Sequence, residues 1–211
     1  MMTDDIKTKL LLAFLQDVPF EGCCEKTLTK AAQKLNIPLH EQILMYPDGL
    51  DDVIAYSYHY FDQKMLETCQ SDTLTDMKIR DKVSFCVWQR FEAMKPYKQA
   101  LLQIHAHMTL PGNLLLKQQF IFQTASEIWY AIGDQSTDWN FYSKRMLLSL
   151  VYISTLLCWF QDKSENHQDT KAFLSRRIEN VMMIPKAKGQ IKEQFSRVPN
   201  FFSLLKQFRD V

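Results

Sequence analysis

The chain has 211 residues, of which 46% are hydrophobic and 23% are charged, and its formal net charge is +1. This apolar content is enough to form a buried core, which excludes a disordered tail, whereas the near-neutral charge argues neither for nor against nucleic acid. Only 5 glycines are present, which leaves few of the tight turns that β-hairpins need. Leu, Lys, Gln, Met and Ala are plentiful, and these residues favour helices. The composition therefore predicts an all-α fold.

The first predicted helix begins at a cap formed by Thr3 and Asp4 and ends at Pro19 and Gly22. Its apolar residues recur at the spacing of one helical face: Ile6, Leu10, Ala13 and Phe14. The opening residues MMTDDIKTK contain neither a basic segment followed by an apolar core nor an arginine. They therefore do not resemble a secretory signal or a mitochondrial presequence, although a mature protein would have lost the latter.

Two short helices follow, one predicted to end at about Leu35 and the other at Tyr46, with a break at residues 36–38. A stop at residues 47–49 then precedes a longer helix. Two short helices joined by a tight turn are typical of a helix-turn-helix, and this spacing resembles the N-terminal module of TetR-type regulators. An ordinary hairpin of two helices explains the pattern equally well.

The charges of this module disfavour DNA binding. No Lys or Arg occurs from Leu35 to Gln63, and the same window contains five acidic residues: Glu41, Asp48, Asp51, Asp52 and Asp62. A recognition helix needs cations or amides near phosphates and base edges, and His40 and Gln42 compensate poorly for so many acids. The sequence therefore predicts a regulator-like fold without a nucleic-acid partner.

The middle of the chain predicts two helices separated near Pro96, the second closed by Pro111 and Gly112, and a further helix in LLLKQQFIFQTASEIWYAIGD. Residues 146–160 are then apolar almost all round. These 15 residues fall short of the roughly 20 that cross a bilayer, so a buried helix or a dimer interface is expected. A capped amphipathic helix follows in SENHQDTKAFLSRRIENVMM.

No catalytic or metal-binding motif was found. The five cysteines are odd in number and irregularly spaced, which predicts reduced thiols: Cys23, Cys24, Cys69, Cys86 and Cys158. His105 and His107 are two residues apart, so on a helix they point away from each other and cannot share a metal. No nucleotide-binding or hydrolase motif occurs. The protein is therefore predicted to be non-enzymatic, with no metal and no cofactor.

The segment GDQSTDWNFYSKR, residues 133–145, is the most informative stretch. Ser136, Thr137 or Asp138 is expected to cap a helix that begins near Trp139. Its bulky residues divide between two faces: Trp139, Tyr142 and Met146 on one, and Phe141, Arg145 and Leu148 on the other. Both faces cannot enter the core beside a polar loop, so some aromatic surface is expected to remain for a partner. The alternative is that all of these side chains are core, which periodicity favours for Trp139.

The region from LPGNLLLKQQF to LLCWFQD, with the string WYAIGDQSTDWNFYSKR at its centre, resembles the signature region of the ubiquinone-biosynthesis accessory proteins. These proteins are lipid-binding relatives of the TetR fold. The resemblance runs from about Thr3 to Asp169. It implies a protein without chemistry of its own that holds an isoprenoid or other apolar lipid and presents quinone precursors to the di-iron hydroxylase of demethoxyubiquinone. It also implies a homodimer through the helix at residues 146–160 and the helix after it.

The family's docking patch for the hydroxylase is carried over to five residues of this chain: Ile128, Trp129, Phe141, Tyr142 and Arg145. Many family members have Trp in place of Phe141, so the anchor remains aromatic while its fine specificity is open. The residues that line the lipid pocket are not assigned. The bound ligand is expected to be an isoprenoid or a phospholipid.

The tail contains a further apolar stripe flanked by cations. We expect it to lie in a membrane interface through seven residues: Phe201, Phe202, Leu204, Leu205, Lys206, Phe208 and Arg209. Relatives in the family use a terminal amphipathic helix in this way, and residues 185–189 form the expected hinge. The alternative is a tail helix packed on its own domain or on a dimer partner.

Together these observations predict a TetR-like helical bundle in three parts: a helix-turn-helix-like module at residues 1–65, a lipid-binding and dimerisation domain at 66–184, and a hinge with an amphipathic helix at 185–211. The predicted function is that of a lipid-presenting accessory protein of ubiquinone biosynthesis, with a ligand-responsive transcriptional regulator as the alternative. The expected location is the inner-membrane surface, on the cytoplasmic side in a bacterium or on the matrix side in a mitochondrion.

Overall fold

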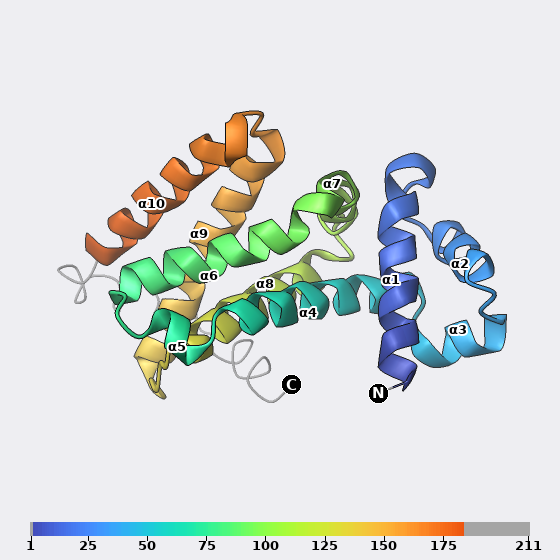
Figure 1. The fold of residues 1–211 in the computed structure, drawn as a ribbon, viewed down its shortest axis with the longest axis horizontal. Helices are drawn as coiled ribbons and strands as arrows, with labels where there is room; N and C mark the ends of the chain where they lie inside the picture. Colours follow the sequence, from blue (N-terminus) through green and yellow to red (C-terminus); the bar gives the residue numbers. More distant parts are fainter. Residues whose placement is uncertain (1, 184–211) are drawn as a thin grey trace. The chain divides into compact units, whose positions relative to one another are not determined.

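The computed structural model describes residues 2–183, and within this range it contains helices and no strand (Figure 1). The prediction of an all-α fold is confirmed. The predicted hinge at residues 185–189 and the seven predicted membrane-binding residues, Phe201 to Arg209, lie outside the described residues. No helix of the described range is long and apolar enough to cross a membrane.

The chain divides into two compact units. Within the described range, the first comprises residues 2–68 and 89–120, and the second comprises residues 69–88 and 121–183. The first unit contains α1 (Met2–Glu21), α2 (Glu25–Lys34), α3 (Leu39–Met45), α4 (Leu50–Thr68), the 3₁₀ turn Lys95–Tyr97 and α7 (Lys98–His107). The second contains α5 (Ser71–Leu74), α9 (Trp139–Gln161), the 3₁₀ turn Glu165–His167 and α10 (Gln168–Met183). Two helices contribute to both units: α6 (Ile79–Met94) and α8 (Leu114–Ala131).

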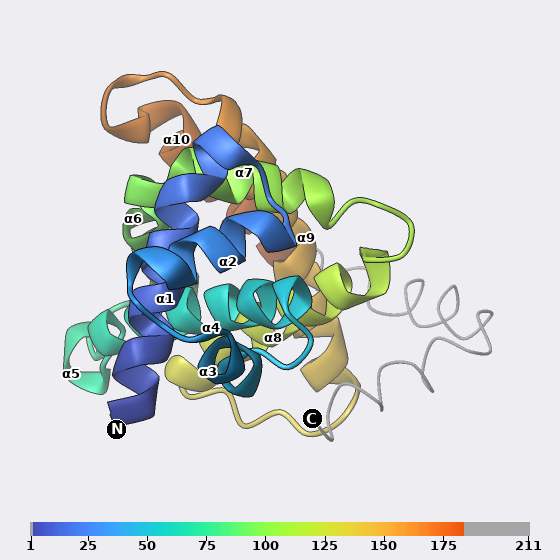
Figure 2. The same cartoon turned by 90° about the vertical axis from the view of Figure 1, so that its right-hand side faces the viewer.

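Helix α1 is the centre of the first unit and packs against α2, α4 and α7 (Figure 2). It runs past the predicted stop at Pro19 and ends where Gly22, at φ +88°, donates its N–H to the carbonyl of Val18. Proline lacks only its own N–H and has a helical φ, so a position in the last turn costs one hydrogen bond rather than the helix. The predicted end at Pro19 is therefore wrong, and the end at Gly22 is confirmed.

The expected pair of short helices is present as α2 and α3, which contact each other across a turn at residues 35–38. The turn forms because Asn36 adopts φ +55°, which lets Ile37 donate its N–H back to the carbonyl of Ala32. Glu25 at the start of α2 then accepts the N–H of Leu50 at 2.5 Å and so fixes the start of α4. Gly49 at φ +56° is needed there, because a Cβ atom would collide with the carboxylate of Glu25.

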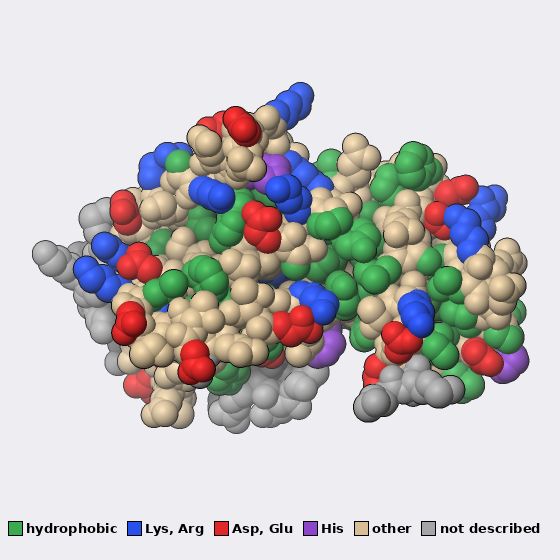
Figure 3. Space-filling model, in the orientation of Figure 1, with side chains coloured by type: hydrophobic (Ala, Val, Ile, Leu, Met, Phe, Trp, Pro, Cys, Tyr) green, Lys and Arg blue, Asp and Glu red, His purple; other side chains and the backbone are tan. Residues whose placement is uncertain are grey.

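Helix α3 is oriented with its polar residue inward and its apolar residues outward. Gln42 is buried, whereas Leu39, Ile43 and Leu44 are exposed. Figure 3 shows apolar side chains on the surface of the α1–α3 region, at the right of the view. The exposed face of α3 therefore offers apolar contacts and no cation.

A buried ion pair crosses the interior of the first unit. Arg90 of α6 donates from Nε to Oδ1 of Asp62 of α4 at 2.6 Å, and both side chains are buried. The guanidinium also lies over the ring of Tyr58, 5.6 Å from its centroid. A buried arginine with a hydrogen-bonded carboxylate is the arrangement in which burial of charge is compensated best.

In the second unit, α9 packs against α10. The turn between them is organised by Asp162, whose carboxylate accepts hydrogen bonds from both the backbone and the hydroxyl of Ser164 and of Thr170. Burial raises the pKa of Asp162, but these four hydrogen bonds outweigh burial and hold the pKa well below its usual value. Along α9 one face is buried, from Phe141 to Trp159, while Leu150 and Leu157 are exposed. The predicted homodimer through this helix stays a prediction.

Candidate functional site

The signature segment forms the corner between α8 and α9 in the second unit, and Gly133 makes the corner. At φ +84° this glycine lets two N–H groups turn back onto α8: Gly133 donates to the carbonyl of Tyr130 at 3.0 Å, and Asp134 donates to that of Trp129 at 2.9 Å. This pair of hydrogen bonds is a Schellman motif, which needs a left-handed residue at the position of Gly133. The chain consequently reverses immediately after Trp129 and Tyr130.

Asp138, one of the three residues predicted as a possible cap, caps α9. Its carboxylate accepts the N–H of Asn140 at 3.0 Å, and the first helical residue is Trp139. The seven residues from Ile132 to Asp138 therefore connect two capped helix ends. Because both ends are held by specific hydrogen bonds, the aromatic residues on either side of the corner are fixed relative to one another.

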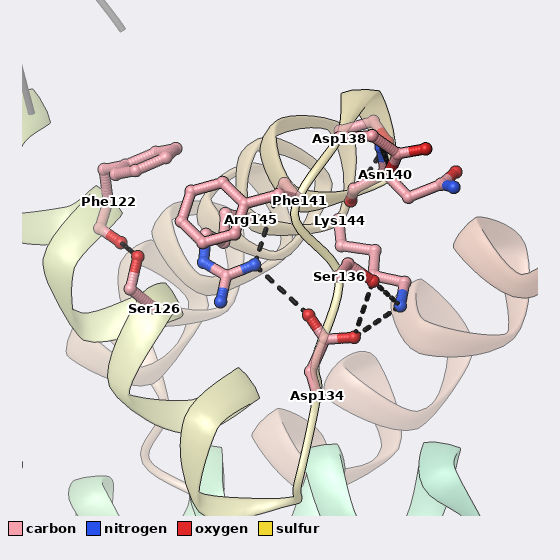
Figure 4. A network of polar contacts seen from close by, with 10 residues as sticks. Phe122, Ser126, Asp134, Ser136, Asp138, Asn140, Phe141, Lys144 and Arg145 are labelled. Carbon is pink, nitrogen blue, oxygen red and sulfur yellow. Dashed lines mark hydrogen bonds and ion pairs between the residues drawn. The ribbon is translucent and has the colours of Figure 1, made fainter. Parts of the chain in front are cut away.

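Asp134 holds the corner together from inside. Its buried carboxylate accepts hydrogen bonds from Lys144 at 2.5 Å, from Ser136 at 2.9 Å and from Arg145 at 3.3 Å (Figure 4). Lys144 also donates to the hydroxyl of Ser136 at 2.7 Å. Burial raises the pKa of Asp134, but the hydrogen bonds from Lys144, Ser136 and Arg145 and the charge of Lys144 outweigh it. The pKa lies below its usual value, so Asp134 is ionised at neutral pH.

Arg145 is completely buried, with 0% of its side chain exposed. Its Nη1 donates both to Asp134 and, at 3.1 Å, to the carbonyl of Phe141. Its guanidinium lies 3.5 Å from the ring centroid of Phe141 and 4.8 Å from that of Tyr130, while Nε and Nη2 have no hydrogen-bond partner among the described residues. Contact with aromatic faces is worth roughly 1–2 kcal/mol for a desolvated cation and partly compensates for these missing bonds. Arg145 therefore holds the rings of Phe141 and Tyr130 in place at the corner.

The aromatic side chains at the corner form one continuous group. Phe141 contacts Phe122 and lies 5.1 Å from Tyr142 and 6.5 Å from Tyr130, measured between ring centroids. Lys144 lies over the ring of Trp129 at 5.2 Å. Of these rings, Tyr130 is 56% exposed, Trp129 and Tyr142 are half-buried, and Phe141 is buried. The partly exposed rings of Trp129, Tyr130 and Tyr142 thus form an aromatic edge of the corner, next to the buried ring of Phe141.

The five predicted partner-binding residues are brought together at this corner but differ in exposure. Ile128, Phe141 and Arg145 are buried, so in this structure they support the surface rather than form it. Trp129 and Tyr142 remain accessible in part. Partner binding by the set stays a prediction, and Trp139, for which periodicity favoured the core, is half-buried.

Three residues of the corner were not among the predicted site residues: Tyr130, Asp134 and Lys144. Tyr130 is the most exposed of its aromatic side chains. The acid of GDQSTD and the two cations of SKR were a usable signal for an ion pair, because opposite charges flanked a short loop in the sequence. In the described part of the chain, no group of three His, Cys, Asp or Glu residues is placed to hold a metal ion. The corner offers contacts and charge rather than reactive groups.

Comparison with known proteins places the signature segment, residues 133–145, within the match to a known family. Residues 117–185 match the model of the COQ9 family. The chain is 27% identical over 199 residues to the mitochondrial ubiquinone biosynthesis protein COQ9 of Bos taurus and 25% identical over 199 residues to that of Homo sapiens. Each alignment covers 90% of this chain and 61% of the relative, so the chain spans about three-fifths of these proteins. The corresponding protein of Dictyostelium discoideum is 24% identical over 94% of this chain and 66% of its own length.

Among solved structures, the fold is similar to that of a TetR transcriptional regulator from Nitrosomonas europaea, with a TM-score of 0.69. The match covers 83% of this chain and 97% of the regulator at 16% sequence identity, which supports a common fold and nothing further. The TetR-like fold is therefore confirmed. The resemblance inferred from the signature segment is confirmed as well, because residues 117–185 match the COQ9 family model and the chain is similar to COQ9 proteins along most of its length.

Proposed function

We propose that this chain is a non-catalytic accessory protein of ubiquinone biosynthesis that binds an isoprenoid quinone precursor and presents it to the di-iron demethoxyubiquinone hydroxylase. The observation that carries the proposal is the corner between α8 and α9. It lies within the COQ9-matching residues and holds an exposed aromatic edge in place by buried charges. Such rigid aromatic groups beside a cation are what protein interfaces use as anchors.

The proposed docking surface consists of Trp129, Tyr130, Tyr142 and Lys144, with Phe141 and Arg145 beneath it. Aromatic side chains lose little conformational entropy on binding when they are already packed on one side. The carboxylate of Asp134 offsets one of the two nearby positive charges, so the docking surface combines aromatic contact with one net positive charge. Truncation of the exposed rings should therefore weaken binding without unfolding the corner.

The docking test is the double variant Tyr130→Ala with Tyr142→Ala, titrated against the hydroxylase of the same organism. We expect the dissociation constant to rise roughly 10- to 100-fold, which corresponds to the loss of about 1.4–2.7 kcal/mol. Phe20→Ala is the matched control, because Phe20 is an exposed aromatic residue of the other unit. An unchanged affinity of the double variant, with an unchanged melting temperature, would contradict the proposed surface.

Lipid binding is tested by organic extraction of the purified protein and mass spectrometry of the extract. A lipid-presenting protein should return an isoprenoid or phospholipid in a fixed ratio to the chain. A sample that is empty after purification without detergent, and that also takes up no added ubiquinone precursor, would contradict this part of the proposal.

We also propose a mitochondrial location at the matrix face of the inner membrane, on the basis of the relatives, whose names describe them as mitochondrial. The tail at residues 190–211 is the proposed membrane-binding segment, from its pattern of Phe, Leu, Lys and Arg. Deletion of this tail should reduce flotation of the protein with liposomes. Equal flotation of the full-length and truncated proteins would exclude a role for the tail in membrane binding.

Because the fold is TetR-like, a transcriptional regulator is the second candidate function. The surface of α3 argues against it, because its exposed side chains are Leu39, His40, Glu41, Ile43 and Leu44. Apolar and acidic groups at this position cannot neutralise phosphates. Strong, salt-sensitive retention on a heparin column at low salt would favour the regulator.

A further inference from the structure

Lys117 is a buried cation near the start of α8. The residue is only 6% exposed, so its ammonium is far less accessible to water than that of a surface lysine. Nζ lies 3.2 Å from Nε2 of His105 on α7, within hydrogen-bond distance. No carboxylate of the described residues forms an ion pair with Lys117. The amine is thus enclosed by the protein without an opposite charge.

Burial of the Lys117 ammonium disfavours its charged form, and the pKa values of Lys117 and His105 reflect this. Burial lowers the pKa of Lys117, and burial together with the charge of Lys117 lowers the pKa of His105 to about 4. His105 is therefore neutral at physiological pH and offers a lone pair, not a negative charge. A buried charge without a counter-charge is destabilising, and a ligand that carries the missing negative charge would offset part of this effect.

Exposed leucines precede Lys117 in the chain. Five exposed leucines lie on α7, on the turn after it, and on the first turn of α8: Leu102, Leu110, Leu114, Leu115 and Leu116. Leu114 to Leu116 directly precede Lys117 in the sequence, and the turn from α7 to α8 that leads to them can be followed in Figure 2. Large apolar side chains that are exposed at neighbouring positions of the chain, as at Leu114, Leu115 and Leu116, offer a binding surface for an apolar group.

We propose that Lys117 binds the anionic head of a long-chain amphiphile and that the hydrocarbon chain of this ligand lies on the five leucines. The inference deepens the proposed lipid-binding function and rests on it. It adds a second class of ligand beside the quinone precursor, a hydrocarbon chain that ends in a carboxylate or a phosphate. One charge at one end of an apolar surface matches this class, because a neutral lipid leaves the ammonium unpaired and a hydrophilic anion leaves the leucines bare.

The experiment compares three probes with the same hydrocarbon chain: oleate, oleyl phosphate and oleyl alcohol. Binding to the full-length protein is measured by titration calorimetry below the concentration at which the probes form micelles. We expect at least one of the two anionic probes to bind about 10-fold tighter than the alcohol, which corresponds to roughly 1.4 kcal/mol. Preference for oleate or for oleyl phosphate then distinguishes a carboxylate head from a phosphate head.

The variant Lys117→Met keeps the length and the apolar stem of the side chain and removes its charge. It should abolish the preference for the anionic probe, leave the affinity for oleyl alcohol unchanged, and melt at the same temperature as the parent protein or higher. Lys26→Met, at an exposed lysine of the same unit, is the matched control and should change none of these affinities. If Lys117→Met fails to fold, the head-group preference of the parent protein, measured with Lys117→Arg alongside it, still decides the question.

Two results would overturn the inference while leaving lipid binding intact: equal affinity of the parent protein for all three probes, and equal loss of affinity for all three probes in Lys117→Met. The first would show that the head group is not recognised, and the second that Lys117 only supports the packing of α8. Failure of all three probes to bind, together with an extract free of lipid, would instead contradict the proposed function itself.

Discussion

The two units of the molecule each bury an arginine, and the two arginines are treated differently. Arg90 in the first unit meets Asp62 at 2.6 Å, and both side chains are buried. Arg145 in the second unit is 3.3 Å from Asp134, which it shares with the closer Lys144, and two of its donor nitrogens have no hydrogen-bond partner in the described part of the chain. The first arrangement connects two helices inside a core. The second supports a corner whose aromatic edge is exposed.

The difference suggests that the degree of pairing separates structural charges from functional ones in this chain. A fully paired buried charge is held in one geometry and stabilises that geometry. A partly paired buried charge lacks some of its hydrogen bonds or counter-charge. Aromatic rings, neighbouring charges or a ligand must then compensate for what is missing. Lys117 extends the same series, because it forms no ion pair with an acidic residue of the range 2–183.

The largest expected effect is that of Asp62→Ala. Removal of this carboxylate leaves the guanidinium of Arg90 buried without an opposite charge, and we expect the free energy of unfolding to fall by about 3–5 kcal/mol. Urea unfolding monitored by circular dichroism measures the loss. Arg90→Met together with Asp62→Leu should be much less damaging, because no unpaired charge remains. A loss below about 1 kcal/mol in Asp62→Ala would show that the two arginines do not differ as proposed.

For Asp134→Asn we expect a smaller decrease in the free energy of unfolding, about 2 kcal/mol. The rings of Phe141 and Tyr130 still cover Arg145 in this variant, and Lys144 can turn toward solvent. The same substitution should weaken docking of the hydroxylase, since the corner loses its internal fastening. Affinity and unfolding free energy are measured on the same sample. A loss as large as that of Asp62→Ala would remove the distinction between the two arginines.

The pH dependence of stability gives a second measure of Asp134. Its pKa in the folded state lies below the usual value, so the folded protein binds this proton less readily than the unfolded chain does. The stabilisation by Asp134 is therefore complete above the unfolded pKa, near 4, and is lost as the pH falls through the folded pKa. The difference in unfolding free energy between the parent protein and Asp134→Asn should shrink as the pH is lowered from about 5 toward 2. A constant difference over that range would mean that charge does not cause the effect.

The helices were largely predictable, because their signals are local. The caps, glycines and prolines placed the breaks between α2 and α3, near Pro96, and before Trp139. Pro19 misled because a proline in a last turn removes one hydrogen bond without ending the helix. The predicted domain boundaries, the dimer and the tail remain predictions.

The candidate site was less predictable, because exposure is set by tertiary packing. Periodicity correctly separated Phe141 and Arg145 from Tyr142, but it could not show that the face with the arginine is the buried one. A charged residue is ordinarily assigned to the surface, and only Asp134 together with two flanking rings allows Arg145 to be buried. Helix α3 shows the opposite case, with Gln42 inside and leucines outside.

The smallest effect is expected from Lys144→Met. Lys144 has the shortest ion pair with Asp134, at 2.5 Å, yet 38% of its side chain is exposed, so water screens the charge and would solvate it if the pair were broken. We expect a loss of about 0.5–1 kcal/mol in urea unfolding, and less in 1 M salt. In contrast, Arg145→Met should cost more than Lys144→Met despite its longer contact of 3.3 Å, because Arg145 also fills the space between Phe141 and Tyr130. If the order were reversed, distance rather than burial would govern these pairs, and the contrast between the two buried arginines would lose its physical basis.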